Sequence, residues 1–415
     1  MNTFTLIFLF ALALSSGVQF WLAQRQAVYV AAHRDAVPEA FKDRVPLEAH
    51  QKAADYTLAK GKLSMVDGVL SIIVLLLFTL GGVINAVFAF WSSAVSSALW
   101  AGVLASASVF LLMSVIELPT SWYQTFVIEE RFGFNKSSVA QFVKDHLLQL
   151  ALGAAIGLPL LALILWVMDS IGSLWWLWAW AIIMGFSLLM SWLYPTVIAP
   201  LFNEFTPMQD GALKQRISSL LERCGFNSQG IFIMDGSKRS GHGNAYFTGL
   251  GNNKRIVFFD NLVNSLEDEE LEAVLAHELG HFKCKHVIKM LIASSVMTLI
   301  SFAILGVLIT QDWFYTGLGV DIAQKSNAVA LLLFMLVSSS FTFFIQPISA
   351  YFQRKFEFEA DDFAAQHAQA SKLISGLVKL YEENASTLTP DPLYSAFHYS
   401  HPPAAIRIAH LESKA

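Results

Sequence analysis

Long stretches without a charged side chain alternate with polar segments along the chain. Residues 1–24 carry no charge, and residues 68–116 carry none over a length well beyond the roughly 20 residues of one membrane-spanning helix. The serine-rich segment 91–97 predicts a turn that divides this second window into two helices. Four more uncharged windows cover residues 147–168, 170–203, 290–311 and 326–353. The pattern predicts seven membrane-spanning helices.

Composition agrees with a membrane protein. The 415 residues are 55% hydrophobic and 14% charged, whereas soluble domains carry about 25% charged residues. This argues against a soluble cytosolic enzyme and excludes intrinsic disorder. The net charge of −5 indicates no nucleic-acid partner, and no obligate protein partner is evident. The two cysteines, Cys224 and Cys284, form neither a CxxC pair nor a disulfide framework.

The first hydrophobic window has two interpretations. A secretory signal peptide also begins with an apolar stretch, and Leu14-Ser-Ser-Gly could precede a cleavage site. However, the basic region of a signal peptide is missing and the window runs past 20 residues. We therefore expect a retained helix.

The distribution of lysine and arginine predicts the orientation in the membrane. If seven helices alternate in direction, segments 25–67, 117–146, 204–289 and 354–415 share one face, which then carries 26 of the 27 basic residues. If the long 204–289 segment is left out, this face still carries 16 lysine and arginine residues and the opposite face carries 1. By the positive-inside rule, this face and the C-terminus are cytoplasmic and the N-terminus lies outside.

These assignments divide the chain into four parts. We expect five membrane helices with cytoplasmic loops, the first part of a polar domain, two further membrane helices, and the second part of the polar domain, over residues 1–199, 200–286, 287–353 and 354–415. The first polar part mixes helices and strands. It predicts a helix over 213–224, strands over 231–234, 244–248 and 255–259, a glycine-rich loop over 236–243, a turn through Gly249 to Asn253, and a helix that begins at the N-cap Ser265.

The predicted helix ends in the sequence His277-Glu278-Leu-Gly-His281, which is an HExxH pattern. Residues four apart share a helix face, so both imidazoles can bind one zinc ion. Zinc lowers the pKa of its bound water to about 7, and Glu278 can accept the proton as hydroxide attacks a carbonyl. A chance match is the alternative, and we expect zinc ligation.

A catalytic zinc needs a third protein ligand. Glu357 is the best candidate because its segment follows the seventh helix and returns to the face that carries HExxH. Asp361 is four residues further and could orient an imidazole. By spacing alone, a solvated acidic surface explains this segment equally well. Other candidates are His242, His367, His398, His401 and His410, and we interpret His286 as an ordinary interfacial histidine.

Several motifs together resemble the type 1 CAAX prenyl proteases, which are integral-membrane zinc endopeptidases. The matching stretches follow the family's order over essentially the whole chain. They are residues 126–136 (FVIEERFGFNK), 240–247 (SGHGNAYF), 277–281 (HELGH), 354–361 (RKFEFEAD) and 398–403 (HYSHPP), followed by Arg407.

The resemblance implies a fold and a site. It implies a mostly α protein with seven membrane helices around a large internal chamber, capped by a small α+β zincin-like domain. It implies one Zn²⁺ per chain held by His277, His281 and Glu357, and Glu278 as the catalytic base. Asp361 supports the site or donates a proton. The resemblance also places Asn244 and His398 beside the substrate and implies that Arg407 holds the site together.

The implied function is hydrolysis of peptide bonds at the cytoplasmic membrane face, with CAAX-type processing of a peptide or lipidated protein beside membrane lipid. The predicted loop over residues 312–325 is shorter than in eukaryotic members, and the last four residues are no ER-retrieval signal. Both features favour a bacterial plasma-membrane protein.

Other function classes fit less well. A quality-control membrane metalloprotease would share HExxH but has fewer spans. A retinal protein needs a lysine in a late helix, and the window 326–353 contains none. A transporter usually places ionisable residues midway along its spans, and the predicted central stretches contain none. A non-enzymatic receptor has no use for HExxH coupled to Glu357.

Overall fold

The computed structural model describes residues 2–226, 230–248 and 255–414, and the chain is predominantly helical. Its first half contains α1 (Thr3–Ala32), α2 (Leu47–Phe78), α3 (Val83–Ala94), α4 (Ala98–Tyr123), the π-helix η2 (Gln124–Glu129), α5 (Glu130–Phe132), α6 (Val139–Ser170), α7 (Trp175–Leu193), the π-helix η4 (Tyr194–Ile198) and α8 (Ala199–Phe202). Its second half contains the helices α9 (Ala212–Arg223), α10 (Asp260–Ser265), α11 (Asp268–Lys283), α12 (His286–Leu308), α13 (Asp312–Gly317), α14 (Asn327–Thr342), α15 (Gln346–His367), α16 (Ala370–Glu383), α17 (Pro392–His398) and α18 (Ala404–Glu412).

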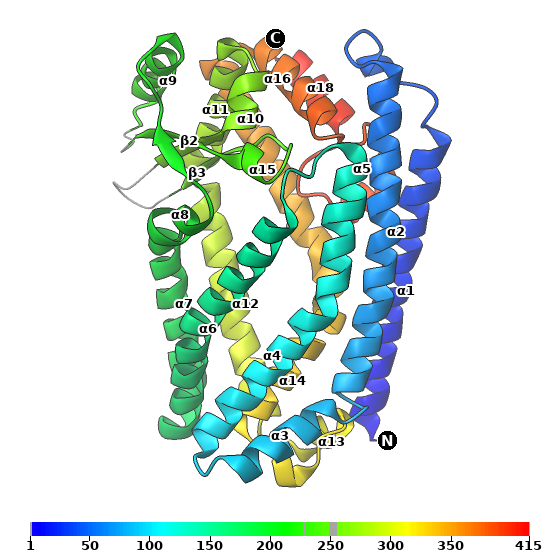
Figure 1. Ribbon diagram of the computed structural model, residues 1–415, viewed down its shortest axis with the longest axis vertical. Coiled ribbons are helices and arrows are strands. Elements are labelled where there is room, and N and C mark those ends of the chain that lie inside the picture. Colours follow the sequence, from blue (N-terminus) through cyan, green and yellow to red (C-terminus); the bar gives the residue numbers. More distant parts are fainter. Residues whose placement is uncertain (1, 227–229, 249–254, 415) are drawn as a thin grey trace.

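The described residues form seven helical segments that are long and apolar enough to cross a membrane, so the predicted number is confirmed. Continuous helical runs make up the spans Thr3–Ala32, Leu47–Phe78, Ala98–Phe132, Val139–Ser170, Gly172–Phe202, His286–Leu308 and Asn327–His367. Only 6% of the most apolar window of α2 is buried inside the protein. The first and last described residues lie at opposite ends of the long axis, as an odd number of spans requires (Figure 1).

The uncharged window 68–116 contains one more break than we predicted. The expected turn lies between α3 and α4, but α2 already ends at Phe78 and the short helix α3 stands between the two spans. Gly82 adopts φ +80°, a left-handed conformation that costs glycine little. The twelve residues of α3 are too few to cross a bilayer. Apolar composition could not reveal this break because α3 is as hydrophobic as its neighbours.

The third span is also longer than predicted. Glu117 does not end it, because α4 continues through Pro119 and into η2 and α5. Glu117 and Asp67 instead line a cavity of about 690 Å³ between α1, α2, α4 and α14. The two carboxylates that bound the uncharged window 68–116 therefore face one internal cavity.

A polar domain forms the end of the molecule that carries the C-terminus (Figure 1). Its four-stranded sheet contains β1 (Phe205–Pro207), β2 (Ile231–Met234), β3 (Ala245–Thr248) and β4 (Arg255–Phe259) in the order β1-β2-β4-β3. The β2–β4 pair is parallel and the other two pairs are antiparallel. This order makes β3 an edge strand. The three predicted strands are present, β1 was missed, and the predicted turn from Gly249 to Asn253 lies outside the described residues.

The domain core packs α9, α11 and α16 against the sheet. Ile217, Phe258, Leu271 and Leu373 are almost fully buried in this core. Helix α11 begins at a capping box in which the Glu267 backbone N–H donates to Glu270. The predicted N-cap Ser265 was wrong, because Ser265 ends the preceding helix α10.

We expect the two ends of the chain to lie on opposite faces of the membrane. A reporter fused at Asn2 should read external and a reporter fused after α18 should read cytoplasmic, because 26 of the 27 basic residues share the C-terminal face. Reporter activity in cells checks this result. Cytoplasmic signals from both fusions would contradict the seven-span topology.

Candidate metal centre

The candidate site forms where α11 and α15 approach at backbone distance. A Cβ added at Gly280 would lie 2.8 Å from the Cα atom of Ala360 and 2.9 Å from its carbonyl oxygen. A side chain at position 280 would therefore force the two helices apart. Glycine within the HExxH sequence allows the contact that brings α15 against His277 and His281.

Three potential ligand side chains meet at this contact. The Nε2 atoms of His277 and His281 are 3.2 Å apart. Glu357 places one carboxylate oxygen 3.2 Å from His281 Nε2 and the other 3.6 Å from His277 Nε2. Ligand atoms about 2.1 Å from a tetrahedral zinc would lie roughly 3.4 Å from one another. The spacing of these donor atoms therefore fits a small tetrahedral cation.

The hydrogen bonding of the same atoms also leaves room for a cation. Glu357 Oε2 is buried and makes no hydrogen bond within the described structure. Three positively charged or protonatable groups surround it at 2.7 Å (His401), 3.5 Å (Arg407) and 3.6 Å (His277). Burial lowers the pKa of His281, but the neighbouring Glu357 carboxylate outweighs burial and raises this pKa. The cluster as a whole therefore favours an added positive charge.

Asp361 and Arg407 both contact the His277 ring, and Arg407 Nη2 lies 3.0 Å from its Nδ1 and 3.1 Å from its Nε2. Asp361 is fully buried and lies 2.8 Å from His277 Nδ1, so it can accept the proton of that nitrogen and leave Nε2 facing the site. Arg407 donates two hydrogen bonds of 2.8 Å to the Asp361 carboxylate. Burial opposes the charge of Arg407, but Asp361 outweighs burial and raises its pKa.

His281 has a similar support, which sequence analysis missed. His281 Nδ1 lies 3.0 Å from His286 Nδ1, and His286 Nε2 lies 3.0 Å from Glu359. The His286 ring is buried and stacks on Phe356. The interpretation of His286 as an ordinary interfacial residue is therefore incomplete. Its spacing from HExxH gave no signal, because the contact depends on a left-handed Lys285 (φ +57°) that turns the chain between α11 and α12.

The same region contains a second group of metal-ligand types, formed by Cys284, His286 and Glu359. Proton positions argue against its use as a separate metal site. When His281 Nε2 binds a metal, its Nδ1 carries the proton and donates to His286 Nδ1. The remaining proton of neutral His286 then lies on Nε2, where it meets Glu359. No nitrogen of His286 is left for a second cation.

Strand β3 presents an open edge. Phe259 N–H donates to Asn244 O, and bonded residues alternate in an antiparallel pair. Ala245 and Phe247 therefore direct their N–H and C=O groups away from β4. The Ala245 N–H donates a hydrogen bond of 2.8 Å to Oδ1 of the Asn244 side chain.

The other predicted residues are distributed as follows. Glu278 lies on α11 beside His277 and is partly exposed. His398 contacts Gln346, Phe343, Tyr394 and Phe397, and none of these is a predicted metal ligand. Among the alternative ligands, His401 reaches Glu357, whereas His242, His367 and His410 contact Asn384, Phe363 and Asp362 respectively.

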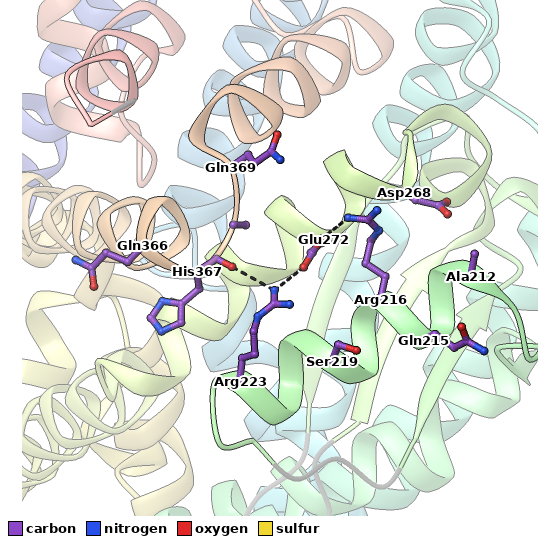
Figure 2. A pocket seen from close by; sticks show the side chains of 11 residues that line it. Ala212, Gln215, Arg216, Ser219, Arg223, Asp268, Glu272, Gln366, His367 and Gln369 are labelled. Atoms are coloured by element: carbon purple, nitrogen blue, oxygen red, sulfur yellow. Dashed lines mark hydrogen bonds and ion pairs between the residues drawn. The ribbon is translucent and has the colours of Figure 1, made fainter.

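A polar cavity of about 710 Å³ lies on a different part of the domain, between α9, α11 and the end of α15. Figure 2 shows Arg223 between Glu272 and the backbone of His367, and Arg216 beside Glu272. Arg216 also pairs with Glu269. His277, His281 and Glu357 do not line this cavity, whereas the alternative ligand His367 does.

Comparison with known proteins agrees with this arrangement. Residues 26–204 match the family model of the N-terminal region of CAAX prenyl proteases with five membrane helices. Residues 207–415 match peptidase family M48. CAAX prenyl protease 1 of Saccharomyces cerevisiae is 35% identical, covering 94% of this chain and 91% of the yeast protein. A homolog from Dictyostelium discoideum is 36% identical, covering 91% of this chain and 90% of that protein.

A solved structure shows the same fold. The crystal structure of S. mikatae Ste24p matches with a TM-score of 0.92 and 32% sequence identity, covering 99% of both chains. The spans and the polar domain therefore both match the same family of proteins. This chain belongs to the CAAX prenyl proteases of peptidase family M48 and is an integral-membrane metalloendopeptidase.

Proposed function

We propose that the protein is a zinc endopeptidase that processes prenylated proteins ending in a CAAX sequence. The observation that carries this proposal is the convergence of two imidazoles and one buried carboxylate at tetrahedral spacing. It is supported by relatives that are CAAX prenyl proteases by name and similar over most of their length.

His277, His281 and Glu357 would hold the zinc ion, which polarises a scissile carbonyl and makes a water molecule acidic when bound. Glu278 accepts the proton of the attacking water and can return it to the leaving amine. Its partly exposed position leaves it free for both transfers. His401, next to Glu357 Oε2 at 2.7 Å, is 65% exposed and can move aside when a cation neutralises the carboxylate.

The imidazoles must present the correct nitrogen to the metal. The Nδ1–H of His277 would donate to Asp361 and the Nδ1–H of His281 to His286, so both Nε2 atoms keep an electron pair for the metal. Arg407 neutralises Asp361 and prevents a buried, unpaired carboxylate.

We further propose that β3 binds substrate as an added strand. Its open edge would bond to the substrate backbone in the manner of β-strand addition. In this structure the Asn244 side chain occupies the Ala245 N–H, so a substrate must displace it or bond to Asn244 itself. His398 would donate a hydrogen bond to the oxyanion that forms on the attacked carbonyl.

The basic residues on the C-terminal face favour a cytoplasmic metal domain. The short segment 312–325 favours the plasma membrane of a bacterium. Membrane lipid would hold the prenyl group of the substrate beside the site.

Substitution of the ligands and of the base should separate zinc binding from turnover. His277→Ala, His281→Ala and Glu357→Ala should lose zinc and activity. Glu278→Gln should keep one zinc per chain and lower the turnover of a prenylated CaaX peptide by about 10²–10⁴-fold. Metal analysis of the purified protein and peptide cleavage check both results.

His367→Ala is the matched control, because His367 lies on the same helix as Glu357 and, among the described hydrogen bonds, its side chain bonds only to the Phe363 backbone oxygen. It should keep zinc and activity. Full zinc occupancy in Glu357→Ala would remove Glu357 from the ligand set. An unprenylated peptide cleaved as well as the prenylated peptide would show that lipid is not required.

Loss of the groups behind the imidazoles should weaken zinc binding without abolishing it. Asp361→Asn and His286→Ala should each lower zinc affinity or turnover by about 10–100-fold. Titration with a chelator measures the affinity. Asp361→Asn is preferable to alanine because it keeps the shape beside the buried Arg407. Cys284→Ser should change nothing, and loss of a second zinc equivalent in this variant would instead assign His286 to a separate metal site.

The substrate strand can be tested through its backbone. Ala245→Pro should abolish cleavage and keep zinc, because proline removes the outward N–H of β3. Asn244→Ala should mainly raise KM, and His398→Ala should lower kcat by about 10²–10³-fold. Steady-state kinetics and metal analysis distinguish these effects. Normal kinetics in both Asn244→Ala and Ala245→Pro would dismiss β3 as the substrate strand.

A further inference from the structure

The motif at residues 126–136 has no role in the chemistry described above, although it covers the last turns of the third span and the loop that follows them. Its last residues contact the loop that leads into β3. Phe134 O accepts a hydrogen bond of 2.9 Å from Gly241 N, and Lys136 N donates one of 3.2 Å to Arg239 O. Asn135 and Ser240 form an isolated antiparallel bridge between these two contacts. The two loops therefore pair through their backbones.

His242 joins this loop pair to the second and third spans. Its ring stacks on Phe134 at a centroid distance of 4.2 Å. Its Nε2 atom lies 3.3 Å from the Tyr56 hydroxyl and 3.5 Å from the Glu129 carboxylate. Tyr56 itself donates a hydrogen bond of 2.7 Å to Glu129.

Asn384 holds the same segment from the end of α16. Its Oδ1 atom accepts from Gly243 N at 3.1 Å, and its Nδ2 atom donates to Gly243 O at 3.3 Å. Because Oδ1 is an acceptor, His242 Nδ1 donates to it at 3.2 Å. Gly243 is the residue directly before Asn244, so both backbone groups next to the proposed substrate strand are fixed.

The groups that hold His242 are themselves well packed. Tyr56, Ile128, Phe132 and Phe134 form a buried cluster. Gly133 turns the chain between two members of this cluster with φ +82°, a conformation that favours glycine. We refer to Tyr56, Glu129, Phe134, His242 and Asn384 as the anchor. The anchor connects two membrane spans and the end of α16 to the start of β3.

We propose that the anchor sets the position of β3, so that the open edge of this strand lines up with the metal site for a bound peptide. The proposal rests on the proposed role of β3 in substrate binding. The anchor residues are positioning residues that touch neither the substrate nor the metal ligands. Substrate residues that pair with β3 along its length would depend on the anchor, whereas chemistry at the metal would not.

This role predicts a specific kinetic pattern in the full-length protein. His242→Phe keeps a ring against Phe134 but removes both hydrogen bonds of the imidazole, and Tyr56→Phe removes a single oxygen atom. Each should raise KM for a long farnesylated CaaX peptide by about 10-fold while kcat and zinc content stay near wild type. A minimal farnesylated peptide has too little backbone to pair along β3, and its KM should not change.

Arg216→Gln is the matched control. It removes the ion pairs of Arg216 with Glu269 and Glu272, which connect α9 to α11. Figure 2 shows the pair with Glu272. Arg216 has no described contact with the anchor or with β3, so both kinetic constants should stay at the wild-type values for both peptides.

The outcomes separate this inference from the proposed function. Unchanged KM in His242→Phe and Tyr56→Phe, together with loss of cleavage in Ala245→Pro, would overturn the anchor but keep β3 as the substrate strand. Unchanged KM in all three variants would overturn both. Loss of zinc, or an equal loss of kcat with the long and the minimal peptide, would show general damage to the domain and would also overturn the anchor.

Discussion

The contact between Gly280 and Ala360 is the constraint on which the site depends. It brings a helix of the first polar segment against a helix of the second at a distance that excludes any Cβ at position 280. The His277–Glu357 and His281–Glu357 distances both follow from this approach. The geometry of the candidate ligands is therefore defined by how closely two helix backbones can pack as well as by the choice of side chains.

Buried charge ties the remaining elements to this contact. Arg407, on α18, is buried and would be costly to leave unpaired, so its bonds to Asp361 fix α18 against α15. Glu270 plays a comparable part at the start of α11, where Lys379 and Ser375 of α16 bond to it. Polar pairs that arise from different helices thus hold the domain in one arrangement around His277.

Much of the fold could be predicted because a bilayer restricts composition strongly. Spans were visible as uncharged windows, and their number is confirmed. The break before α3 was missed because Gly81-Gly82 lies within uninterrupted apolar sequence and adds no charge. The continuation of α4 beyond Glu117 was missed for the opposite reason, because a carboxylate facing an internal cavity looks in sequence like the end of a span.

The candidate site shows where sequence information ends. HExxH is a local pattern with helical spacing, and Asp361 follows Glu357 by one helical turn, so both could be recognised along the chain. The neighbours of His286 and His242 depend on left-handed turns and on contacts between distant segments, such as His242 with Tyr56 at a separation of 186 residues. The roles of the predicted site residues remain predictions, but their convergence needed the tertiary structure to be seen.

The division of the polar domain by α12 and α14 has a consequence for biosynthesis. His277 emerges from the ribosome 130 residues before Arg407. A nascent chain that ends after α12 carries the histidine pair without Glu357, Asp361 or Arg407, and so holds only part of the candidate metal centre. The proposed site is completed only by residues that follow α14 along the chain, so cleavage through it requires synthesis to pass that span.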